Sequence, residues 1–365
     1  MKPVVDLIVG ARPNFMKVAP LWHALRGSDL LTVRLVHAAQ HENFELSQVF
    51  LDEFDLLPPD ISFKVGKGTH GEQIARALSA YEAICIDSPA SLCVVVGDVN
   101  TTLACALAAN KTHVPVAHLE SGLRSFDRSM PEEINRVLTD SLSEILWTPS
   151  ADASENLYRE GFSTSRIKMV GNIMIDTLVM MQKKTQVAAS ERQLLPTFNG
   201  ITVTFHRPAN VDNRANLTEI VKQILAASEL AEIAFPIHPR TRMKLEEFGL
   251  ETQISSAKGV TLLPPLGYLD FMGLVARSKL VITDSGGVQE ETSFLGIPCL
   301  TARESTERPI TISQGTNQLS PISEIYSRAA IELLRPRSSV AIPLWDGLTR
   351  HRVAAEIHNY FNLPT

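Results

Sequence analysis

Three acidic residues stand where a parallel α/β fold places catalytic groups. Asp98 and Glu120 lie within two residues of the ends of two predicted buried strands, Leu92–Val96 and Val114–His118, and Glu132 lies in the first turn of a predicted helix. A carboxylate at the carboxyl end of a strand serves either as a helix cap or as a catalytic group. Taken alone, the position of Asp98 favours the cap.

The predicted helix that begins at Pro131 carries a charged pair. Glu132 and Arg136 are four residues apart, the spacing of neighbours on one helix face. The pair is either a surface ion pair worth about 0.3–0.5 kcal/mol, or Arg136 positions Glu132 over a substrate. The apolar residues predict a buried stripe made of Ile134, Val137, Leu138, Leu142 and Ile145.

A cationic turn follows the first predicted strand, Val4–Val9. Gly10 allows the chain a sharp exit from the strand, and Pro13 suits the first turn of a helix. Arg12 and Lys17 would then lie near a helix N-terminus, where unpaired N–H groups attract anions. A plain turn with two solvated cations explains the same residues equally well.

A second loop suited to anions follows the predicted strand Leu280–Thr283. Residues 284–291 read Asp-Ser-Gly-Gly-Val-Gln-Glu-Glu. Gly286 and Gly287 let a phosphate approach the backbone, the following helix presents unpaired N–H groups, and Glu291 is placed to reach a ribose diol. An ordinary turn with acids near a helix start is the alternative, but the Ser-Gly-Gly favours phosphate binding.

Basic residues recur after the strands of the C-terminal half. His206 and Arg207 follow Ile201–Phe205, Arg240 follows the next predicted strand, and Arg308 lies beyond the last one. Each alone fits a solvated loop residue. Their repetition indicates a polyanionic ligand.

These residues are positioned by short apolar runs that alternate with amphipathic segments, the pattern of a parallel sheet with helices on both faces. The first half is predicted to hold strands at Val4–Val9, Thr32–His37, Leu92–Val96 and Val114–His118 and helices at Val18–Leu25, Phe44–Phe54, Glu72–Ile84 and Thr102–Ala109. The pattern restarts with strands at Ile201–Phe205, Ile233–Ile237, Val260–Leu263, Leu280–Thr283 and Pro298–Thr301 and helices at Leu217–Leu225, Asp270–Ala276 and Val288–Leu295.

The restart, together with the length of 365 residues, predicts two Rossmann-like doubly wound domains. We expect an N-terminal domain over residues 1–175, joined by a C-terminal helix within 350–365, and a C-terminal domain over residues 196–349. The connection between them is placed at Met181–Asn199. In such sheets the ligand lies beyond the carboxyl ends of the strands.

The composition is that of an ordinary globular protein, with 44% hydrophobic and 20% charged residues. It excludes disordered and fibrous classes, and the net charge of −6 argues against a nucleic-acid partner. No apolar run has the length of a membrane span or a secretory signal, so we expect a soluble, cytoplasmic protein without a membrane partner. The cysteines at 85, 93, 105 and 299 lack metal-ligand spacing, so we expect buried, reduced thiols and no metal site.

Residues 66–71 match the dinucleotide-binding string G-x-G-x-x-G. The preceding segment, Ile61–Val65, is short and partly polar, and the first strand of the fold lies elsewhere, so the match is weak. We expect no nicotinamide cofactor.

Taken together, these segments resemble the non-hydrolysing UDP-N-acetylglucosamine 2-epimerases over nearly the whole chain. The residues that carry the resemblance are Gly10-Ala11-Arg12-Pro13 with Lys17, Gly97-Asp98, His118-Leu119-Glu120-Ser121-Gly122-Leu123-Arg124, Pro131-Glu132-Glu133-Ile134-Asn135-Arg136, Gly171-Asn172 with Asp176, His206-Arg207, Asp284–Glu291 and Thr306-Glu307-Arg308-Pro309. Each motif is weak alone, and this many in order are highly specific.

The resemblance implies a GT-B-like fold, a homodimer, and a UDP-sugar bound without a cofactor in the cleft between two facing domains. By this resemblance Phe271 packs on uracil and Glu291 holds the ribose hydroxyls. The diphosphate would be held by Arg12, His206, Ser285, Gly286, Gly287 and Arg308. The catalytic residues around the sugar would be Lys17, Asp98, Glu120, Glu132 and Arg136, with His206 counted in both groups.

Enzymes of the family that the chain resembles are thought to invert carbon 2 of the sugar by anti elimination of UDP to a 2-acetamidoglycal, followed by re-addition. The transition state gathers positive charge at the anomeric carbon and negative charge on the diphosphate. Cations and N–H groups would stabilise the departing phosphate, and carboxylates would act as base, acid and cation stabiliser. Asp98 and Glu132 are the favoured pair for proton transfer at carbon 2.

Several places depart from the family pattern: Asn14-Phe15, Gln40-His41-Glu42-Asn43, Val99-Asn100, the short loop Ser125–Met130 and Pro208-Ala209. The stretch from Gln40 lacks the second Gln of the Gln-His-x-Gln motif through which many bacterial members bind an activating UDP-sugar. The loop Ser125–Met130 also resembles that of epimerases acting on UDP-2,3-diacetamido-glucuronate, which is the alternative substrate.

Three other functions remain open from the sequence. A hydrolysing epimerase would release UDP and the free sugar. A GT-B glycosyltransferase would move the sugar to an acceptor and need no proton transfer at carbon 2. A UDP-sugar sensor would keep Ser285–Glu291 but have no need of the carboxylates.

Overall fold

The structure is a computed structural model that describes residues 2–39, 51–191, 195, 197–338 and 341–364, without the side chains of residues 12–13, 183 and 186–191. The chain divides into two compact units. Unit 1 comprises Met1–Met180 and Pro343–Thr365, and unit 2 comprises Met181–Ile342.

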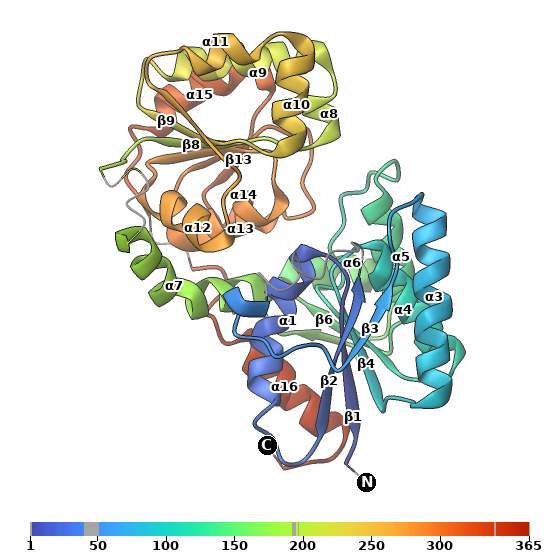
Figure 1. The fold of residues 1–365 in the computed structure, drawn as a ribbon. Coiled ribbons are helices and arrows are strands. Elements are labelled where there is room, and N and C mark those ends of the chain that lie inside the picture. Colours follow the sequence, from blue (N-terminus) through green and yellow to red (C-terminus); the bar gives the residue numbers. More distant parts are fainter. Residues whose placement is uncertain (1, 40–50, 192–194, 196, 339–340, 365) are drawn as a thin grey trace. The chain divides into compact units, whose positions relative to one another are not determined.

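Unit 1 is built on a seven-stranded, all-parallel sheet in the order β3-β2-β1-β4-β5-β6-β7 (Figure 1). The strands are β1 (Val4–Val9), β2 (Thr32–Ala39), β3 (Ile61–Lys64), β4 (Leu92–Val96), β5 (Val116–Leu119), β6 (Ile145–Thr148) and β7 (Ile167–Met169). Successive strands are added outward from β1 to β3 on one side of the sheet and from β4 to β7 on the other, so the strand order reverses between β1 and β4. At that edge β1, β4 and β5 lead directly into Gly10, Gly97 and Glu120, so a doubly wound sheet brings these three turns together.

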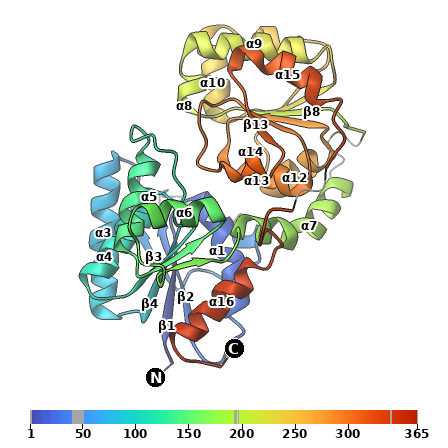
Figure 2. The same ribbon diagram turned by 180° about the vertical axis from the view of Figure 1, so that it is seen from behind.

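Helices cover both faces of this sheet. They are α1 (Arg12–Leu25), α3 (His70–Asp87), α4 (Asn100–Lys111), α5 (Pro131–Leu142), α6 (Ala151–Arg159) and α16 (Thr349–Tyr360). A further helix, α7 (Ile173–Glu191), begins in unit 1 and ends in unit 2. The helices α3, α4 and α5 form one layer, and α1 packs with α16 on the opposite face (Figure 1, Figure 2).

The last helix is fixed to unit 1 by a buried carboxylate. Asp176 is fully buried in α7 and accepts the backbone N–H groups of Thr349 (3.0 Å) and Arg350 (2.8 Å) at the start of α16. A Cβ at Gly171 would lie 2.2 Å from the carbonyl oxygen of Leu344, so the approach of this segment requires glycine. The motif Gly171-Asn172 with Asp176 therefore has a structural explanation, the attachment of the C-terminal segment.

Unit 2 repeats the architecture with a six-stranded parallel sheet in the order β10-β9-β8-β11-β12-β13. The strands are β8 (Ile201–Thr204), β9 (Ile233–Pro236), β10 (Val260–Leu263), β11 (Leu280–Thr283), β12 (Cys299–Thr301) and β13 (Asn317–Leu319). The winding reverses between β8 and β11. At this edge β8 leads into Phe205-His206 and β11 leads into Asp284.

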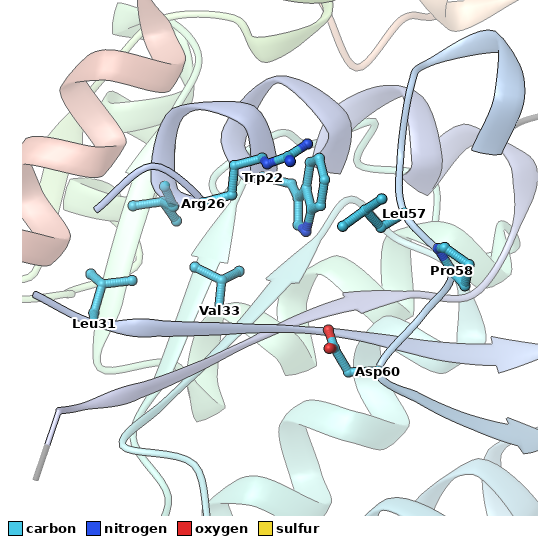
Figure 3. Close-up of a pocket in the computed structure, with 8 residues that line it drawn as sticks. Trp22, Arg26, Leu31, Val33, Leu57, Pro58 and Asp60 are labelled. Carbon is cyan, nitrogen blue, oxygen red and sulfur yellow. The ribbon is translucent and has the colours of Figure 1, made fainter. Parts of the chain in front are cut away.

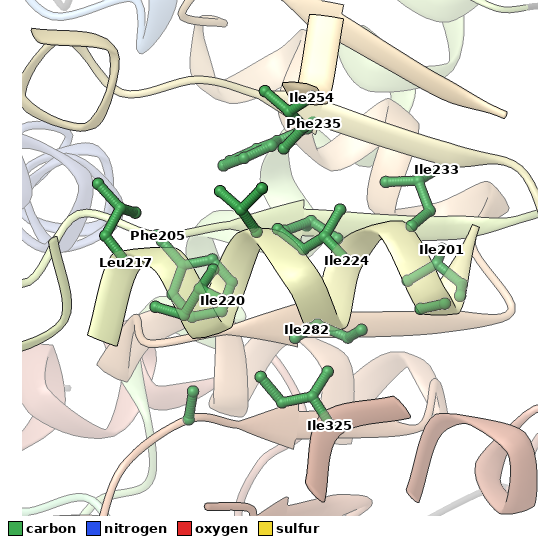
Figure 4. Packing of buried hydrophobic residues seen from close by; sticks show 14 of the residues in the cluster. Ile201, Phe205, Leu217, Ile220, Ile224, Ile233, Phe235, Ile254, Ile282 and Ile325 are labelled. Atoms are coloured by element: carbon green, nitrogen blue, oxygen red, sulfur yellow. The ribbon is translucent and has the colours of Figure 1, made fainter. Parts of the chain in front are cut away.

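The helices of unit 2 also form two layers. They are α8 (Pro208–Val211), α9 (Arg214–Ala227), α10 (Pro239–Phe248), α11 (Glu251–Ser255), α12 (Tyr268–Arg277), α13 (Gly286–Leu295), α14 (Ile310–Ser313) and α15 (Ile325–Glu332), with a 3-10 turn, η1 (Ile322–Glu324). In Figure 1 the helices α9, α10, α11 and α15 lie on one face of the sheet, and α12, α13 and α14 on the other. Figure 4 shows how Leu217, Ile220 and Ile224, at the spacing of one helix face, direct α9 onto Ile201 and Phe235 of the sheet.

The predicted fold class, α/β with two doubly wound parallel sheets, is confirmed. All nine predicted strands exist within two residues of their expected ends, but β6, β7 and β13 were not predicted, and β3 was taken as a short strand at best. Of the predicted helix Phe44–Phe54, residues 44–50 lie outside the described residues. The segment Met181–Asn199, predicted as a connection, continues α7 as far as Glu191.

None of the described helices combines the length and the apolar character that crossing a membrane requires.

Candidate active site

The turn after β4 brings a lysine and two carboxylates together in unit 1. Lys17, from α1, forms an ion pair with Glu120, which follows β5, and both side chains are buried. Gly97 has a φ of +69°, and a Cβ there would lie 2.9 Å from Lys17 Nζ and 3.5 Å from Glu120 Oε2. The left-handed backbone favours glycine at this turn, and a side chain there would also displace Lys17 Nζ from its present position.

Glu120 has two unusual features. Its φ of +74° lies in the left-handed region, which is costly for a residue with a side chain. Its Oε1 is buried and has no hydrogen-bond partner among the described residues. Backbone strain and an unsatisfied buried acceptor tend to be retained at functional sites.

Asp98 is joined to the start of α5 through Arg136. Arg136 donates from Nε to Asp98 Oδ2 at 3.0 Å and from Nη1 to Glu133 Oε2 at 2.6 Å, and its Nη2 lies 2.8 Å from Asp98 Oδ2. Asn135 Nδ2 donates to the Asp98 carbonyl at 2.9 Å. Arg136 and Glu133 are buried, whereas the Asp98 side chain is 26% exposed, so Asp98 is held in place and remains accessible.

Two expectations for α5 were wrong. Arg136 binds Asp98 and Glu133, and Glu132 lies exposed on the first turn of the helix. The stripe predicted to be buried faces outward at Ile134, Val137 and Leu138, which are exposed. The buried face of α5 carries Glu133, Asn135, Arg136, Thr139 and Asp140. The polar residues lie inside because they have ionic and hydrogen-bond partners there.

The expected cap role of Asp98 was also wrong. The N-cap of α4 is Val99, one residue later. Asp98 is thus a carboxylate at the carboxyl end of a strand, paired with a buried arginine.

In unit 2, a buried aspartate organises the loop after β8. Asp284 accepts the backbone N–H groups of His206 and Arg207 and the Nδ2 of Asn210. His206 Nδ1 lies 3.0 Å from Asp284 Oδ1, and the His206 side chain is 39% exposed. Burial by itself raises the pKa of Asp284, yet its hydrogen bonds and the nearby His206 hold that pKa below its usual value. An ionised Asp284 fixes the imidazole with Nδ1 as the donor.

Arginines surround a buried carboxylate next to this loop. Glu307 binds Arg308 Nη1, Arg303 Nη2 (2.8 Å) and, at 3.8 Å, Arg207 Nη2. Arg308 Nε also lies 2.8 Å from Glu290 Oε1. Burial and the charge of Arg303 lower the pKa of Arg207. Three guanidinium groups are therefore matched by Glu307, Glu290 and the neighbouring Asp284, which hold the arginines in place without a net excess of charge.

Arg308 of this cluster lies at the N-terminus of α13. A Cβ at Gly286 would lie 2.7 Å from Arg308 Nη1, whereas a Cβ at Gly287 would meet nothing within 4 Å. The first turn of α13 carries no acidic residue. Gly286 therefore lets Arg308 approach the turn, and Gly287 leaves open space beside helix N–H groups, an arrangement suited to a phosphate.

Glu291 lies on the same helix, and its carboxyl group has a raised pKa. It is buried, and burial is the largest cause that raises its pKa to about 8; the Glu290 charge adds to the rise and the Tyr268 hydroxyl opposes it. Glu291 Oε1 has no hydrogen-bond partner among the described residues. Such an acceptor is suited to a ligand that brings hydroxyl groups.

The structure thus groups the predicted residues by unit. Lys17, Asp98, Glu120 and Arg136 lie together in unit 1, with Glu132 exposed on the same helix as Arg136. His206, Ser285, Gly286, Gly287 and Arg308 lie together in unit 2, with Glu291 on α13 and a half-buried Phe271 on α12. The Arg12 side chain and the stretch Gln40–Asn43 lie outside what the structure describes.

Several polar residues of these groups received no role from the sequence. Glu133 was overlooked beside Glu132, Arg303 was not considered, and Arg207 was counted only among the basic residues that indicate a polyanionic ligand. The signal for Glu133 was helix phase: Glu133, Arg136 and Asp140 recur at the spacing of one helix face. No comparable signal marked Arg303.

A pocket of about 300 Å³ lies elsewhere in unit 1 (Figure 3). It is lined by the C-terminal end of α1, the start of β2 and residues Leu57, Pro58 and Asp60. The Arg26 guanidinium lies over the Trp22 ring at 4.4 Å. None of the predicted site residues contributes to this pocket, which adjoins the amino end of β2.

Comparison with known proteins agrees with the geometry. Residues 23–358 match the profile of the UDP-N-acetylglucosamine 2-epimerase family. A protein of Methanocaldococcus jannaschii named UDP-N-acetylglucosamine 2-epimerase is 38% identical over 359 residues, which cover 96% of this chain and 97% of that protein. A protein of Pseudomonas aeruginosa named UDP-2,3-diacetamido-2,3-dideoxy-D-glucuronate 2-epimerase is 39% identical over 315 residues, 86% of each chain.

A solved structure extends the likeness to three dimensions. The crystal structure of the M. jannaschii UDP-GlcNAc 2-epimerase in complex with UDP-GlcNAc and UDP superposes with a TM-score of 0.89 at 38% identity, covering 98% of this chain and 99% of that one.

Proposed function

The chain belongs to the UDP-N-acetylglucosamine 2-epimerase family, and we propose that it inverts carbon 2 of UDP-N-acetylglucosamine by eliminating UDP and adding it back. It is an enzyme that epimerises UDP-sugars. The observation that carries the proposed chemistry is the cluster at the carboxyl ends of β1, β4 and β5, where Asp98 and Glu120 are each paired with a buried cation.

Elimination needs a base near carbon 2 and a stabilised leaving group. In the proposal Asp98 and Glu132 exchange the proton at carbon 2, and Glu120 with Lys17 lies by the ring, where positive charge develops at the anomeric carbon. Pairing with Arg136 supports a proton-accepting role for Asp98, because the arginine keeps the carboxylate oriented. The exposure of Glu132 is compatible with a group that reaches the substrate only when it is bound.

The departing UDP is assigned to unit 2. Arg308, His206 and the amides of Ser285, Gly286 and Gly287 would hold the diphosphate, together with Arg12 of unit 1. The arginines gathered beside the open turn of α13 support this assignment, since each well-placed donor contributes on the order of 3 kcal/mol to stabilising a developing anion. Glu291 would bind the ribose hydroxyls and Phe271 the uracil.

Proton NMR in deuterium oxide tests the reaction. Turnover of UDP-N-acetylglucosamine should give UDP-N-acetylmannosamine with deuterium at carbon 2 and no accumulation of free UDP. Accumulating UDP and free sugar would instead identify a hydrolysing epimerase. Transfer to an acceptor without exchange at carbon 2 would identify a glycosyltransferase.

A second substrate is favoured by one specific observation, the 39% identity to the P. aeruginosa UDP-2,3-diacetamido-2,3-dideoxy-D-glucuronate 2-epimerase. The two UDP-sugars should be incubated separately. The natural substrate is the one with the higher kcat/KM, and exchange only with the diacetamido sugar would replace the first proposal.

We also propose a homodimer that buries the outward face of α5. Ile134, Val137 and Leu138 are 43%, 36% and 45% exposed on one side of this helix, an apolar surface typical of protein interfaces. Leu138→Asp should lower the mass measured by light scattering from that of a dimer to that of a monomer. Leu334→Asp, at a residue of unit 2 that is 86% exposed, is the matched control and should leave the mass unchanged.

A cytoplasmic location completes the proposal. It is supported by the four free cysteines, all buried and none in a disulfide. Localisation of a tagged chain by fractionation tests it.

A further inference from the structure

A buried histidine on β5 links the two turns that carry the carboxylates of unit 1. His118 has no exposed surface. Its Nδ1 lies 2.6 Å from Asp140 Oδ1 on α5, and its Nε2 lies 2.8 Å from the carbonyl oxygen of Gly97. Both ring nitrogens therefore lie against protein acceptors, and the ring spans the gap between α5 and the Gly97 turn.

Arg124 and Glu160 complete the polar surroundings of Asp140. Asp140 Oδ2 lies 2.7 Å from Arg124, and Arg124 also binds Glu160 through two contacts of 2.7 Å. Burial alone raises the pKa of Asp140, but the charges and hydrogen bonds of His118 and Arg124 hold it below its usual value. Arg124 thus pairs with both Asp140 and Glu160, and His118 occupies the other oxygen of Asp140, so every member of this buried cluster has a polar partner.

The cluster holds both catalytic turns. The Gly97 peptide is fixed to β5 at each end, because its N–H donates to the Leu119 carbonyl at 3.1 Å and its carbonyl accepts from His118. Asp98 is the next residue. On the other side, Asp140 Oδ2 accepts the N–H of Gly122 at 3.1 Å, two residues beyond Glu120.

We propose that His118, paired with Asp140, is a positioning residue that sets Asp98 relative to Glu120 by holding the Gly97 carbonyl. This inference rests on the proposed function, in which Asp98 transfers a proton. His118 itself touches no substrate, and its effect on the reaction passes through the backbone of the Gly97 turn.

Two substitutions separate the two hydrogen bonds. In His118→Gln the amide nitrogen takes the place of Nε2 and can still donate to Gly97, while the contact with Asp140 is lost. In His118→Asn the amide takes the place of Nδ1 and can still donate to Asp140, while the bond to Gly97 is lost. We expect His118→Asn to lower kcat by about 10²-fold, the effect of a misplacement of about 1 Å, and His118→Gln to lower it by less than about tenfold.

Separate measurement of KM and kcat distinguishes a loss of positioning from a general loss of folded structure. KM and UDP affinity should stay within about threefold in both variants, and Asp98→Asn combined with His118→Asn should be no slower than Asp98→Asn alone. Equal losses in the two His118 variants, in proportion to a common loss of thermal stability, would overturn the proposal. So would additive losses in the double variant.

A measurement on the unmodified protein does not depend on the variants folding or on the reaction. With ¹⁵N-labelled histidine, the two ring nitrogens of an imidazolium resonate close together, and those of a neutral ring resonate far apart. His118 is assigned among the ten histidines by the signal lost in His118→Gln or, if that variant does not fold, by its slow exchange with solvent. A His118 ring whose Nε2 carries no proton would refute the hydrogen bond to the Gly97 carbonyl, whereas a protonated Nε2 in a protein that epimerises neither UDP-sugar would refute only the proposed function.

Discussion

Replacing Glu291 by glutamine is expected to abolish a proton release that accompanies the binding of a UDP-sugar. Glu291 is buried on α13, and burial is the main reason why its pKa rises from the usual 4.5 to about 8. At pH 7 about nine-tenths of the free molecules therefore carry a proton on this group. A carboxyl that accepts ribose hydroxyls binds them best when ionised, so the ligand should expel the proton.

The sign and size of the pH effect follow from this pKa. Because the complex favours the deprotonated form, affinity should rise with pH, by up to about tenfold per pH unit, and level off above about pH 8. Stability should run the other way: between pH 4.5 and about 8 the folded state binds one more proton than the unfolded state, so stability falls as pH rises. The full charging cost is on the order of 5 kcal/mol, and Glu291→Gln removes it.

Isothermal titration calorimetry measures the proton directly. UDP-glucose is a suitable ligand, because its diphosphate has no group that titrates near neutrality. Titrations at pH 7 in two buffers of different ionisation enthalpy should give a release of roughly 0.9 proton for the unmodified protein and none for Glu291→Gln. Equal proton release in both proteins, or an affinity that does not change between pH 6 and 8, would refute the reasoning.

Four further substitutions test other parts of the structure. Asp98→Asn and Glu132→Gln should each lower kcat by about 10²-fold or more, measured as deuterium exchange at carbon 2; a loss under about tenfold would remove that residue from the mechanism. Gly97→Ala should lower kcat sharply and destabilise by about 1–2 kcal/mol in urea unfolding, because φ is +69° and the new Cβ meets Lys17; Gly66→Ala, at the same φ with nothing within 4 Å, should show only the stability loss. Asp176→Ala should destabilise by about 1–3 kcal/mol, since two buried N–H groups at the start of α16 lose their acceptor, and an unchanged melting temperature would contradict this.

The fold was predictable from the sequence because parallel sheets buried on both faces are made of continuous apolar runs. Runs such as Leu92–Val96 and Leu280–Thr283 mark strands without ambiguity, and the restart after residue 200 marks the second sheet. The strands that escaped prediction, β6, β7 and β13, have only three or four residues and include polar ones such as Lys168 and Asn317. Their strand state is imposed by neighbours in the sheet, which local sequence does not encode.

The site was predictable only as far as its turns. Polar residues after β1, β4, β5, β8 and β11 identified the right edges of both sheets, because a doubly wound topology fixes where those edges lie. The ion-pair partners of Arg136 were not predictable. The i, i+4 spacing paired Arg136 with Glu132, but Arg136 binds Glu133 and Asp98. The rule describes an isolated helix, and here the direction in which α5 faces its sheet decides which acid the arginine meets.

Burial also separates two histidines that share one type of partner. His206 and His118 both place Nδ1 on a buried aspartate, at 3.0 Å from Asp284 and 2.6 Å from Asp140. His206 is 39% exposed, so its ring keeps an edge that a ligand can reach. His118 has no exposure, and each of its ring nitrogens lies against a protein acceptor, so the ring has no edge left for a ligand. The same His–Asp contact therefore fits the ligand-binding role proposed for His206 and the backbone-positioning role proposed for His118, and the difference lies in the second acceptor, the Gly97 carbonyl.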